Sequence, residues 1–403
     1  MFTCANISGL YDRGRGLLKL LQNLGVALIG IIAACLIAEI GLRIFGPPNP
    51  HFFTYDGDRG WGLRAGAAGW QRDEGEGFVR INRDGMRDID HSIAKPPGTF
   101  RIAVIGDSFT EAQELPRMAT FWSVMQDRLA ACPALAGQIV EALDLGVDGY
   151  GTAQEIMTLD RFGWKYHPDA VVLAFFNGND FRNNSVALEG DKCRPFYVER
   201  AGELVLGGPF EDSEAFRLNC AARFYSRYSR LLDLLGNSHR IIKSFRARHN
   251  PPPVGHEPGL SDSIFAPPRT DDWRKAWTVT EAMLLMLKRD TAEHGARFLV
   301  ADIGSPIQVN PSRVATQRTE ARLGVNDLFY ADHRLAEFGR DNGIEVLDLA
   351  APMQAYAQEH QVYFHGFSNT RYGSGHWNAL GHQFGGRMIA SAVCRMLAPQ
   401  SNP

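Results

Sequence analysis

The sequence lacks the patterns that mark several large classes of protein. Its six cysteines include no C-x-x-C pair, so we do not expect a structural zinc site. Its formal net charge is only −3, which gives no basic excess for nucleic-acid binding. It also has no internal repeat and no long low-complexity tract. We therefore expect an ordinary folded protein with no metal, no other cofactor and no nucleic-acid partner.

Charged residues are absent from Leu20–Ala38, a run of 19 residues. A helix of that length just spans the core of a bilayer, and a buried core helix would instead show a polar face. We predict a cytoplasmic N-terminus at 1–16 and a transmembrane anchor at 17–45. Two alternatives stay open: a cleaved signal peptide, and a lipoprotein signal in which Cys35 is the lipid acceptor.

Basic residues are more numerous before this run than after it, since Arg13, Arg15 and Lys19 precede it and Arg43 follows it. The positive-inside rule therefore predicts a single-pass protein with its large domain outside the cytoplasm, in the periplasm.

Disulfides can form in such a compartment. We favour a pair between Cys193 and Cys220, which flank one insertion, and consider Cys132 with Cys394 as a second pair.

The rest of the chain divides into a glycine- and proline-rich β arm at 46–100 and a larger α/β domain at 101–399. Buried-type strands starting at 101, 138, 169, 297 and 344 alternate with helical segments, which predicts a doubly wound parallel sheet of about five strands. A long insertion occupies 181–275. It includes a predicted helical stretch, Ser213–Phe245, whose basic side is either a solvated face or a contact for anionic lipid or an acidic glycan.

Polar turns follow three of the predicted strands, and they carry Ser108, Gly149 and Asn179. Carboxyl ends of parallel strands are where open α/β sheets bind ligands. A serine needs a nearby base to become a nucleophile, and His376 near the C-terminus could serve as that base. The backbone N–H groups of Ser108 and Gly149 and the side-chain amide of Asn179 could donate to an oxyanion. These residues meet the requirements of ester chemistry.

The segments GDSFTEA, LGVDGYGT, GND and GHWNALGH resemble the four sequence blocks of the SGNH (GDSL-type) hydrolase superfamily, in order and at compatible spacing. The resemblance covers about 101–180 and 280–396. It implies a flavodoxin-like α/β/α sandwich.

By position, the same resemblance implies that Ser108 is the nucleophile and His376 the general base. Ser108, Gly149 and Asn179 would form the oxyanion hole, while Asp107 and Asp180 match positions that are usually structural.

The sequence departs from the family pattern at the acid of the triad. The family places an aspartate two or three residues before the histidine, where this chain has Ser374 and Gly373. We expect first a serine–histidine dyad whose imidazole is held by a backbone carbonyl or by Ser374, and second an Asp or Glu donated from the insertion. His382 is interpreted as a helix residue and not as a second base.

Three functions fit these observations. The first is an envelope-anchored serine esterase that hydrolyses an O-acyl ester, such as an acetyl group on a small molecule or a glycan. The second is an O-acyltransferase to a glycan hydroxyl, because both reactions share an acyl-enzyme. The third is a catalytically silent domain that binds polysaccharide or a protein partner, for which the missing acid is the best support.

Overall fold

The structure is a computed structural model that describes residues 7–45, 50–235, 238, 242 and 260–398. The chain divides into two compact units, Met1–Asn49 with Tyr225–Asn250, and Pro50–Phe224 with Pro251–Pro403. Parts of the predicted regions lie outside the described residues: 1–6 of the N-terminus, 46–49 of the β arm, most of 236–259 in the insertion, and the end of the large domain at 399.

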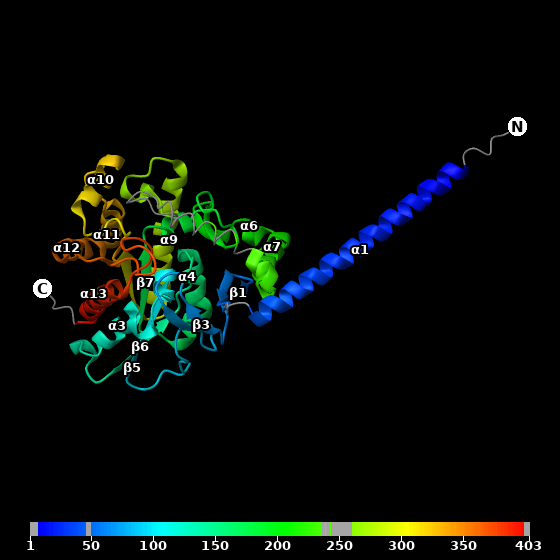
Figure 1. Ribbon diagram of the computed structural model, residues 1–403. Helices are drawn as coiled ribbons and strands as arrows, with labels where there is room; N and C mark the ends of the chain where they lie inside the picture. Colours follow the sequence, from blue (N-terminus) through cyan, green and yellow to red (C-terminus); the bar gives the residue numbers. More distant parts are fainter. Residues whose placement is uncertain (1–6, 46–49, 236–237, 239–241, 243–259, 399–403) are drawn as a thin grey trace. The chain divides into compact units, whose positions relative to one another are not determined.

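A five-stranded parallel sheet forms the centre of the larger unit (Figure 1). Its strands are β5 (Thr99–Gly106), β6 (Ile139–Asp144), β7 (Ala170–Phe176), β10 (Arg297–Ile303) and β11 (Glu345–Asp348). The spatial order β11-β10-β7-β5-β6 is the order of flavodoxin-like sheets. The predicted fold class is therefore confirmed, and each strand begins within two residues of its predicted start.

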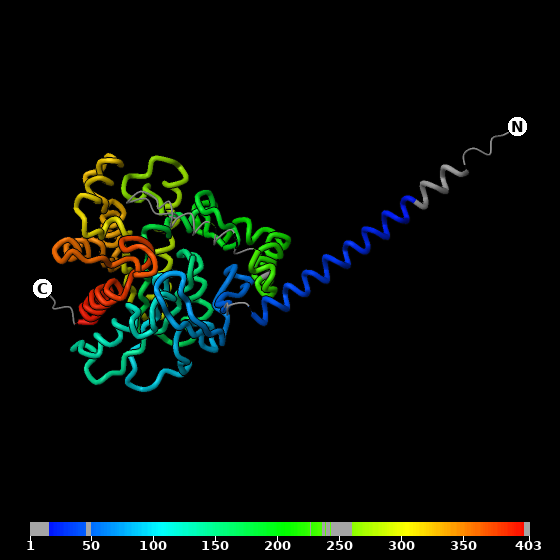
Figure 2. Tube along the Cα trace, viewed as in Figure 1, coloured from blue at the N-terminus to red at the C-terminus, as the bar shows by residue number. Residues whose placement is uncertain are grey.

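Helices cover both faces of this sheet because side chains along each strand alternate between the two faces. Ile102 and Val104 of β5 belong to the core on one face, and Ala103 and Ile105 to the core on the other. The first face is covered by α3 (Phe121–Leu129), α12 (Ala350–His360) and α13 (Ala379–Leu397). The second is covered by α4 (Thr152–Thr158), α9 (Asp271–Glu293) and α11 (Tyr330–Asn342). Figure 2 shows α13 beside α3, which it contacts. Other helices in the described part of this unit are α2 (Ser108–Glu111), α5 (Asp180–Asn183), α6 (Pro209–Asp212), α10 (Arg313–Leu323) and α7 (Glu214–Tyr225), whose last residue belongs to the smaller unit.

The β arm consists of two antiparallel hairpins. One pairs β1 (Phe53–Asp56) with β2 (Gly60–Leu63), and the other pairs β3 (Ala68–Gln71) with β4 (Gly77–Arg80). Val79 of β4 is fully buried. The loop that joins β3 to β4 contains Glu74, which is important for the site.

The insertion is more regular than the sequence suggests, since it contains a hairpin of β8 (Phe196–Arg200) and β9 (Glu203–Gly207). The predicted helical stretch Ser213–Phe245 is interrupted, because α7 ends at Tyr225 and a 3-10 turn, Ser226–Tyr228, follows. Helix resumes at 230–235, and most of the stretch beyond it lies outside the described residues. The two favoured disulfides, Cys193–Cys220 and Cys132–Cys394, are both present.

The smaller unit contains the long helix α1 (Ile7–Phe45). Its segment Gly16–Phe45 has a mean hydropathy of 2.4, so it is long and apolar enough to cross a membrane.

Candidate active site

Three polar turns meet at the carboxyl edge of the sheet because β5, β6 and β7 are neighbouring parallel strands. Ser108 begins α2 directly after β5, Gly149 follows β6, and Asn179 follows β7. These are the positions that the sequence predicts for a nucleophile and two oxyanion donors.

Asp107 holds the turn at Ser108 and links it to Asn179. Its Oδ1 accepts a hydrogen bond from the backbone N–H of Phe109 at 2.9 Å, which caps the short helix α2. Its Oδ2 accepts from the side-chain amide of Asn179 at 3.1 Å. An amide NH₂ group carries two hydrogens, so this contact leaves Asn179 the capacity for a second donation. Burial raises the pKa of Asp107 to about 6.

Gly149 lies in a turn that requires a glycine-like backbone, with φ of 76°. The preceding carbonyl, that of Asp148, accepts a hydrogen bond from Trp61 Nε1 at 3.0 Å. Because a trans peptide unit is planar, holding that carbonyl also fixes the direction of the Gly149 N–H. Trp61 of the β arm therefore orients one of the proposed oxyanion donors.

His376 comes from the loop between α12 and α13. Asn378 caps α13 through bonds from the backbone N–H groups of Leu380 and Gly381, which fixes where this loop ends. The imidazole Nε2 lies 2.8 Å from Ser108 Oγ, a hydrogen-bonding distance. The structure thus brings together the two residues that the sequence selects as nucleophile and base.

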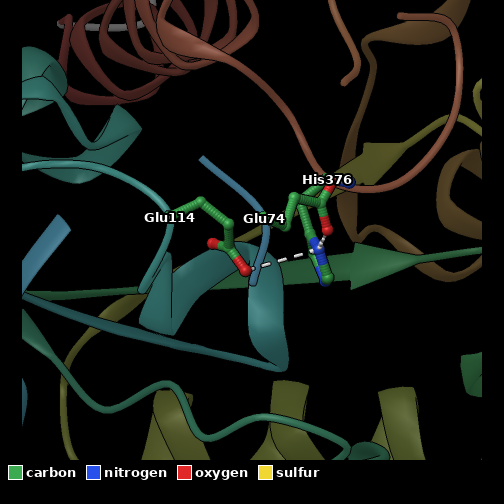
Figure 3. A group of neighbouring side chains, drawn as sticks. All are labelled: Glu74, Glu114 and His376. Atoms are coloured by element: carbon green, nitrogen blue, oxygen red, sulfur yellow. Dashed lines mark hydrogen bonds and ion pairs between the residues drawn. The ribbon is translucent and has the colours of Figure 1, made fainter. Parts of the chain in front are cut away.

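The Glu74 carboxylate binds His376 at two points, as Figure 3 shows. Oε1 accepts from the His376 backbone N–H at 2.9 Å, and Oε2 lies 2.7 Å from the imidazole Nδ1. An ionised carboxylate can only accept, so in the neutral form of the ring Nδ1 carries the proton and Nε2 offers its lone pair to Ser108.

The sequence predicts that the His376 imidazole is held by Ser374 or a backbone carbonyl, or else by an acid from the insertion. Both predictions are wrong. Ser374 does not hold this ring, since its hydroxyl donates to the carbonyl of Arg371 at 3.1 Å. The carboxylate that does hold it comes from the β arm and not from the insertion.

Glu114 is a second carboxylate beside the same ring, with Oε1 3.4 Å from His376 Nδ1. It is buried, and its Oε2 has no hydrogen-bond partner among the described residues. Burial raises the pKa of Glu114. Burial alone would also raise the pKa of Glu74, but its hydrogen bond and its attraction to His376 lower the pKa below the usual value. Glu74 is therefore the more readily ionised of the two carboxylates.

The two carboxylates raise the basicity of His376. Burial on its own would lower the pKa of this imidazole, but the charge of Glu114 and the hydrogen bond to Glu74 outweigh it and raise the pKa well above the usual value.

Glu74, Glu114 and His376 also form the one group of potential metal ligands found among the described residues. Two ligands of a tetrahedral zinc at about 2.0–2.1 Å lie about 3.3 Å apart. The 2.7 Å between Glu74 Oε2 and His376 Nδ1 is shorter and matches a hydrogen bond. We therefore interpret the group as carboxylates that bind an imidazole.

Two further predicted residues have contacts that suit a structural role. Asp180 Oδ2 accepts from the backbone N–H of Phe176 at 2.8 Å and so closes the end of β7. His382 lies within α13, where its Nδ1 accepts from the backbone N–H of Phe121 at 3.0 Å. Burial lowers the pKa of His382 to about 3, so this ring stays neutral.

Glu74 and Glu114 are absent from the sequence-based prediction. Glu74 is 302 positions from His376, and no spacing rule links residues so far apart. One weak signal exists in hindsight: the loop Asp73–Gly77 places acidic residues among glycines, in a chain that lacks the usual acid.

Comparisons with known proteins add little to this description. No family model matches the chain, and no curated protein matches it. Among solved structures, the acetyl xylan esterase AlAXEase is 13% identical with a TM-score of 0.37, over 73% of this chain and 100% of its own. LAE5, an alpha/beta hydrolase enzyme from the metagenome of Lake Arreo, Spain, is 14% identical with a TM-score of 0.36, over 76% and 99%. A lipase/acylhydrolase from Enterococcus faecalis is 13% identical with a TM-score of 0.35, over 75% and 100%. Likeness at this level carries no conclusion about activity, so the fold and the site rest on the geometry of this chain.

Proposed function

We propose that this protein is a membrane-anchored serine esterase of the SGNH type, which cleaves an O-acyl ester through an acyl-enzyme. The observation that carries the proposal is the continuous chain of contacts from Ser108 Oγ through the His376 imidazole to the Glu74 carboxylate. A serine, a base within hydrogen-bonding reach and a group that orients the base are together the signature of nucleophilic catalysis.

In the first half of the reaction, Ser108 Oγ attacks the acyl carbonyl while its proton moves to His376 Nε2. The N–H groups of Ser108 and Gly149 and the amide of Asn179 would stabilise the oxyanion of the tetrahedral intermediate. The C–O bond to the leaving group then breaks, and His376 returns the proton to the departing alcohol. Glu74 stabilises the imidazolium that forms between these steps.

In the second half, a water molecule gives a proton to His376 Nε2 and its oxygen attacks the acyl-enzyme. The bond to Ser108 Oγ breaks, the acid leaves, and His376 reprotonates the serine. If a sugar hydroxyl takes the place of water, the same residues transfer the acyl group. The geometry favours neither acceptor, so O-acyl transfer remains the alternative outcome of the test.

A purely binding role has lost its main support. That alternative rested on the absence of an acid beside His376, whereas Glu74 lies within hydrogen-bonding distance of the ring. The proposed substrate is an acylated small molecule or glycan.

The membrane location of the proposal rests on α1. Its segment Gly16–Phe45 meets the length and hydropathy of a span, and the basic residues before it favour a cytoplasmic N-terminus. The disulfides Cys132–Cys394 and Cys193–Cys220 support a periplasmic location for the larger unit, because such bonds persist in oxidising compartments.

A direct test measures release of acid from p-nitrophenyl esters and from an O-acetylated glycan, with and without an added glycan acceptor. We expect the wild-type protein to hydrolyse a short-chain ester and Ser108→Ala to lose this activity. Transfer to the acceptor without release would favour the transferase. An unchanged rate in Ser108→Ala would contradict both forms of the proposal.

A further inference from the structure

Glu39 of α1 binds the start of another helix of the smaller unit. Its Oε2 accepts from the Ser229 hydroxyl and from the Leu231 backbone N–H, both at 2.9 Å. Its Oε1 accepts from the Arg230 backbone N–H at 3.0 Å and from Arg43 Nε at 2.7 Å. The residues after Ser229 are helical through Leu235 in the described chain. A carboxylate is well suited to the unsatisfied N–H groups of a helix start.

The position of Glu39 along α1 places it at a membrane boundary. The charge-free run before it, Leu20–Ala38, is about 28 Å long at about 1.5 Å per residue, close to the about 30 Å of a hydrocarbon core. If this run spans the core, Glu39 lies where hydrocarbon meets headgroups. A carboxylate there needs partners, and the Ser229 hydroxyl, the N–H groups of residues 230 and 231 and the Arg43 guanidinium supply them.

The helix that Glu39 binds exposes apolar side chains. Leu232 is 51% exposed, Leu234 47% and Leu235 61%. Just before this helix, Tyr225 and Tyr228 are also exposed, and their rings stack on one another. About half of each leucine side chain is exposed in the described part of this unit, which leaves an apolar surface for a partner outside the chain. Tyrosine is typical of the membrane–water interface.

We infer that Tyr225–Leu235, here named the interface segment, is a second membrane-contacting element that lies in the headgroup region of the bilayer. Glu39 holds it to the anchor, and its leucines enter the boundary of the acyl chains. The basic residues Arg227 and Arg230 suit anionic headgroups at that depth. This inference rests on the proposed insertion of α1, and it is independent of the proposed ester chemistry.

Exposed apolar side chains occur on α1 as well as on the interface segment, which favours lipid as the partner. The apolar residues of α1 next to Glu39 are exposed as well, with Ile37 at 71% and Ile40 at 55%. The interface segment therefore continues an apolar surface that already belongs to the candidate span. A second copy of the chain could cover the same leucines, and the test below separates that outcome.

The experiment places an environment-sensitive NBD label on single cysteines in the full-length protein. Cys4→Ser and Cys35→Ser remove the thiols outside the two disulfides, and Leu235→Cys or Leu232→Cys then adds one. The matched control is Val314→Cys, an exposed aliphatic position of α10 in the larger unit. Each protein is reconstituted into phosphatidylethanolamine–phosphatidylglycerol vesicles with and without brominated acyl chains.

We expect brominated lipid to quench the labels at positions 232 and 235 several-fold more than the label at 314, and aqueous iodide to show the opposite order. Iodide access at 232 and 235 without lipid quenching would overturn the inference. Equal lipid quenching at 314 would also overturn it. Shielding from both quenchers would instead show that a protein surface, such as a second copy, covers the leucines.

A second variant tests the role of Glu39. Glu39→Ala should reduce lipid quenching at position 235 while the protein still resists carbonate extraction, because α1 remains inserted. Unchanged quenching would contradict the role of Glu39. Extraction of the wild-type protein would refute the anchor, and ester hydrolysis measured on the same samples reports the proposed chemistry separately.

Discussion

At the scale of single residues, His376 is the centre of the site. It contacts the proposed nucleophile through Nε2, and one carboxylate binds both its ring and its backbone. A carboxylate that holds the backbone N–H as well as Nδ1 fixes the position of the loop and the tautomer of the ring together. In the proposed mechanism, Glu74 takes the role of the triad acid from a segment far away in the sequence.

Glu74→Gln should lower kcat strongly, because an amide NH₂ facing Nδ1 favours the tautomer with its proton on Nε2. In serine proteases the equivalent exchange costs about 10⁴-fold. We expect a loss of about 10²- to 10⁴-fold, since Glu114 can still accept from Nδ1, and a larger loss in the double variant Glu74→Gln/Glu114→Gln.

Steady-state ester hydrolysis measures this effect. The control is Glu76→Gln, whose side chain in the same loop is 59% exposed and pairs with Arg72 at the surface. An ion pair at the surface contributes little to stability. The activity of Glu76→Gln should therefore stay within about twofold of wild type. Wild-type activity in Glu74→Gln would exclude Glu74 as the orienting acid.

Ser374→Ala tests which residue orients the His376 imidazole, Glu74 as in the structure or Ser374 as the sequence predicts. The Ser374 hydroxyl contacts the carbonyl of Arg371, so we expect kcat and KM close to wild type. A loss as large as that of Glu74→Gln would show that the serine supports the imidazole after all.

The pH dependence of kcat/KM should report the carboxylates around His376. The base must be neutral in the free enzyme, so kcat/KM rises as the pH passes the pKa of this imidazole. Glu114 and Glu74 raise that pKa above its usual value. Removing the charge in Glu114→Gln destabilises the imidazolium, so the rise should move to lower pH. A rise that stays in place or moves to higher pH would contradict the role of Glu114.

At the scale of structural elements, the loop between β3 and β4 carries Glu74, and Asn369 binds this loop on both sides of Glu74. The Asn369 side chain accepts from the Gly75 N–H at 2.9 Å and donates to the carbonyls of Arg72 and Gly75 at 3.1 and 2.8 Å. These bonds join both sides of Glu74 to the loop that carries His376.

Asn369→Ala should lower kcat by about 10- to 100-fold with little change in KM, because a displaced acid costs orientation and not substrate binding. Thr370→Ala is the matched control, since the described hydrogen bonds of its hydroxyl lie within its own turn, to the backbone of Phe367. Equal kcat values in the two variants would contradict a positioning role for Asn369.

The elements that the sequence predicts best are those with a strong local pattern. Buried strands such as Ala170–Phe176 are continuous apolar runs, and their ends locate Ser108 and Asn179. The β8–β9 hairpin is missed because its strands are mostly half-exposed and lack a clear alternation. The pairing of Glu74 with His376 depends on how the arm packs against the sheet domain, which no local pattern encodes.

At the scale of the whole molecule, two disulfides close loops of very different size. Cys132–Cys394 spans 262 positions and Cys193–Cys220 spans 27. In the chain-entropy view, the longer loop stabilises by about 5.5 kcal/mol and the shorter by about 3.5 kcal/mol. Cys132→Ser/Cys394→Ser should therefore lower the free energy of unfolding by about 2 kcal/mol more than Cys193→Ser/Cys220→Ser.

Denaturant unfolding of the full chain in detergent, followed by the near-ultraviolet signal of its tryptophans, measures this difference. If Cys193→Ser/Cys220→Ser lowered the free energy of unfolding more than Cys132→Ser/Cys394→Ser, local packing and not loop closure would govern the contribution of these disulfides.

The central claim, that Ser108 is a nucleophile activated by His376, is tested most directly by covalent labelling with a fluorophosphonate. Intact-mass spectrometry of the full-length protein should show one adduct, which peptide mapping places on Ser108. The adduct should be absent in Ser108→Ala and form far more slowly in His376→Ala. A wild-type protein that takes up no label, or a Ser108→Ala variant that is labelled at the wild-type rate, would contradict the account.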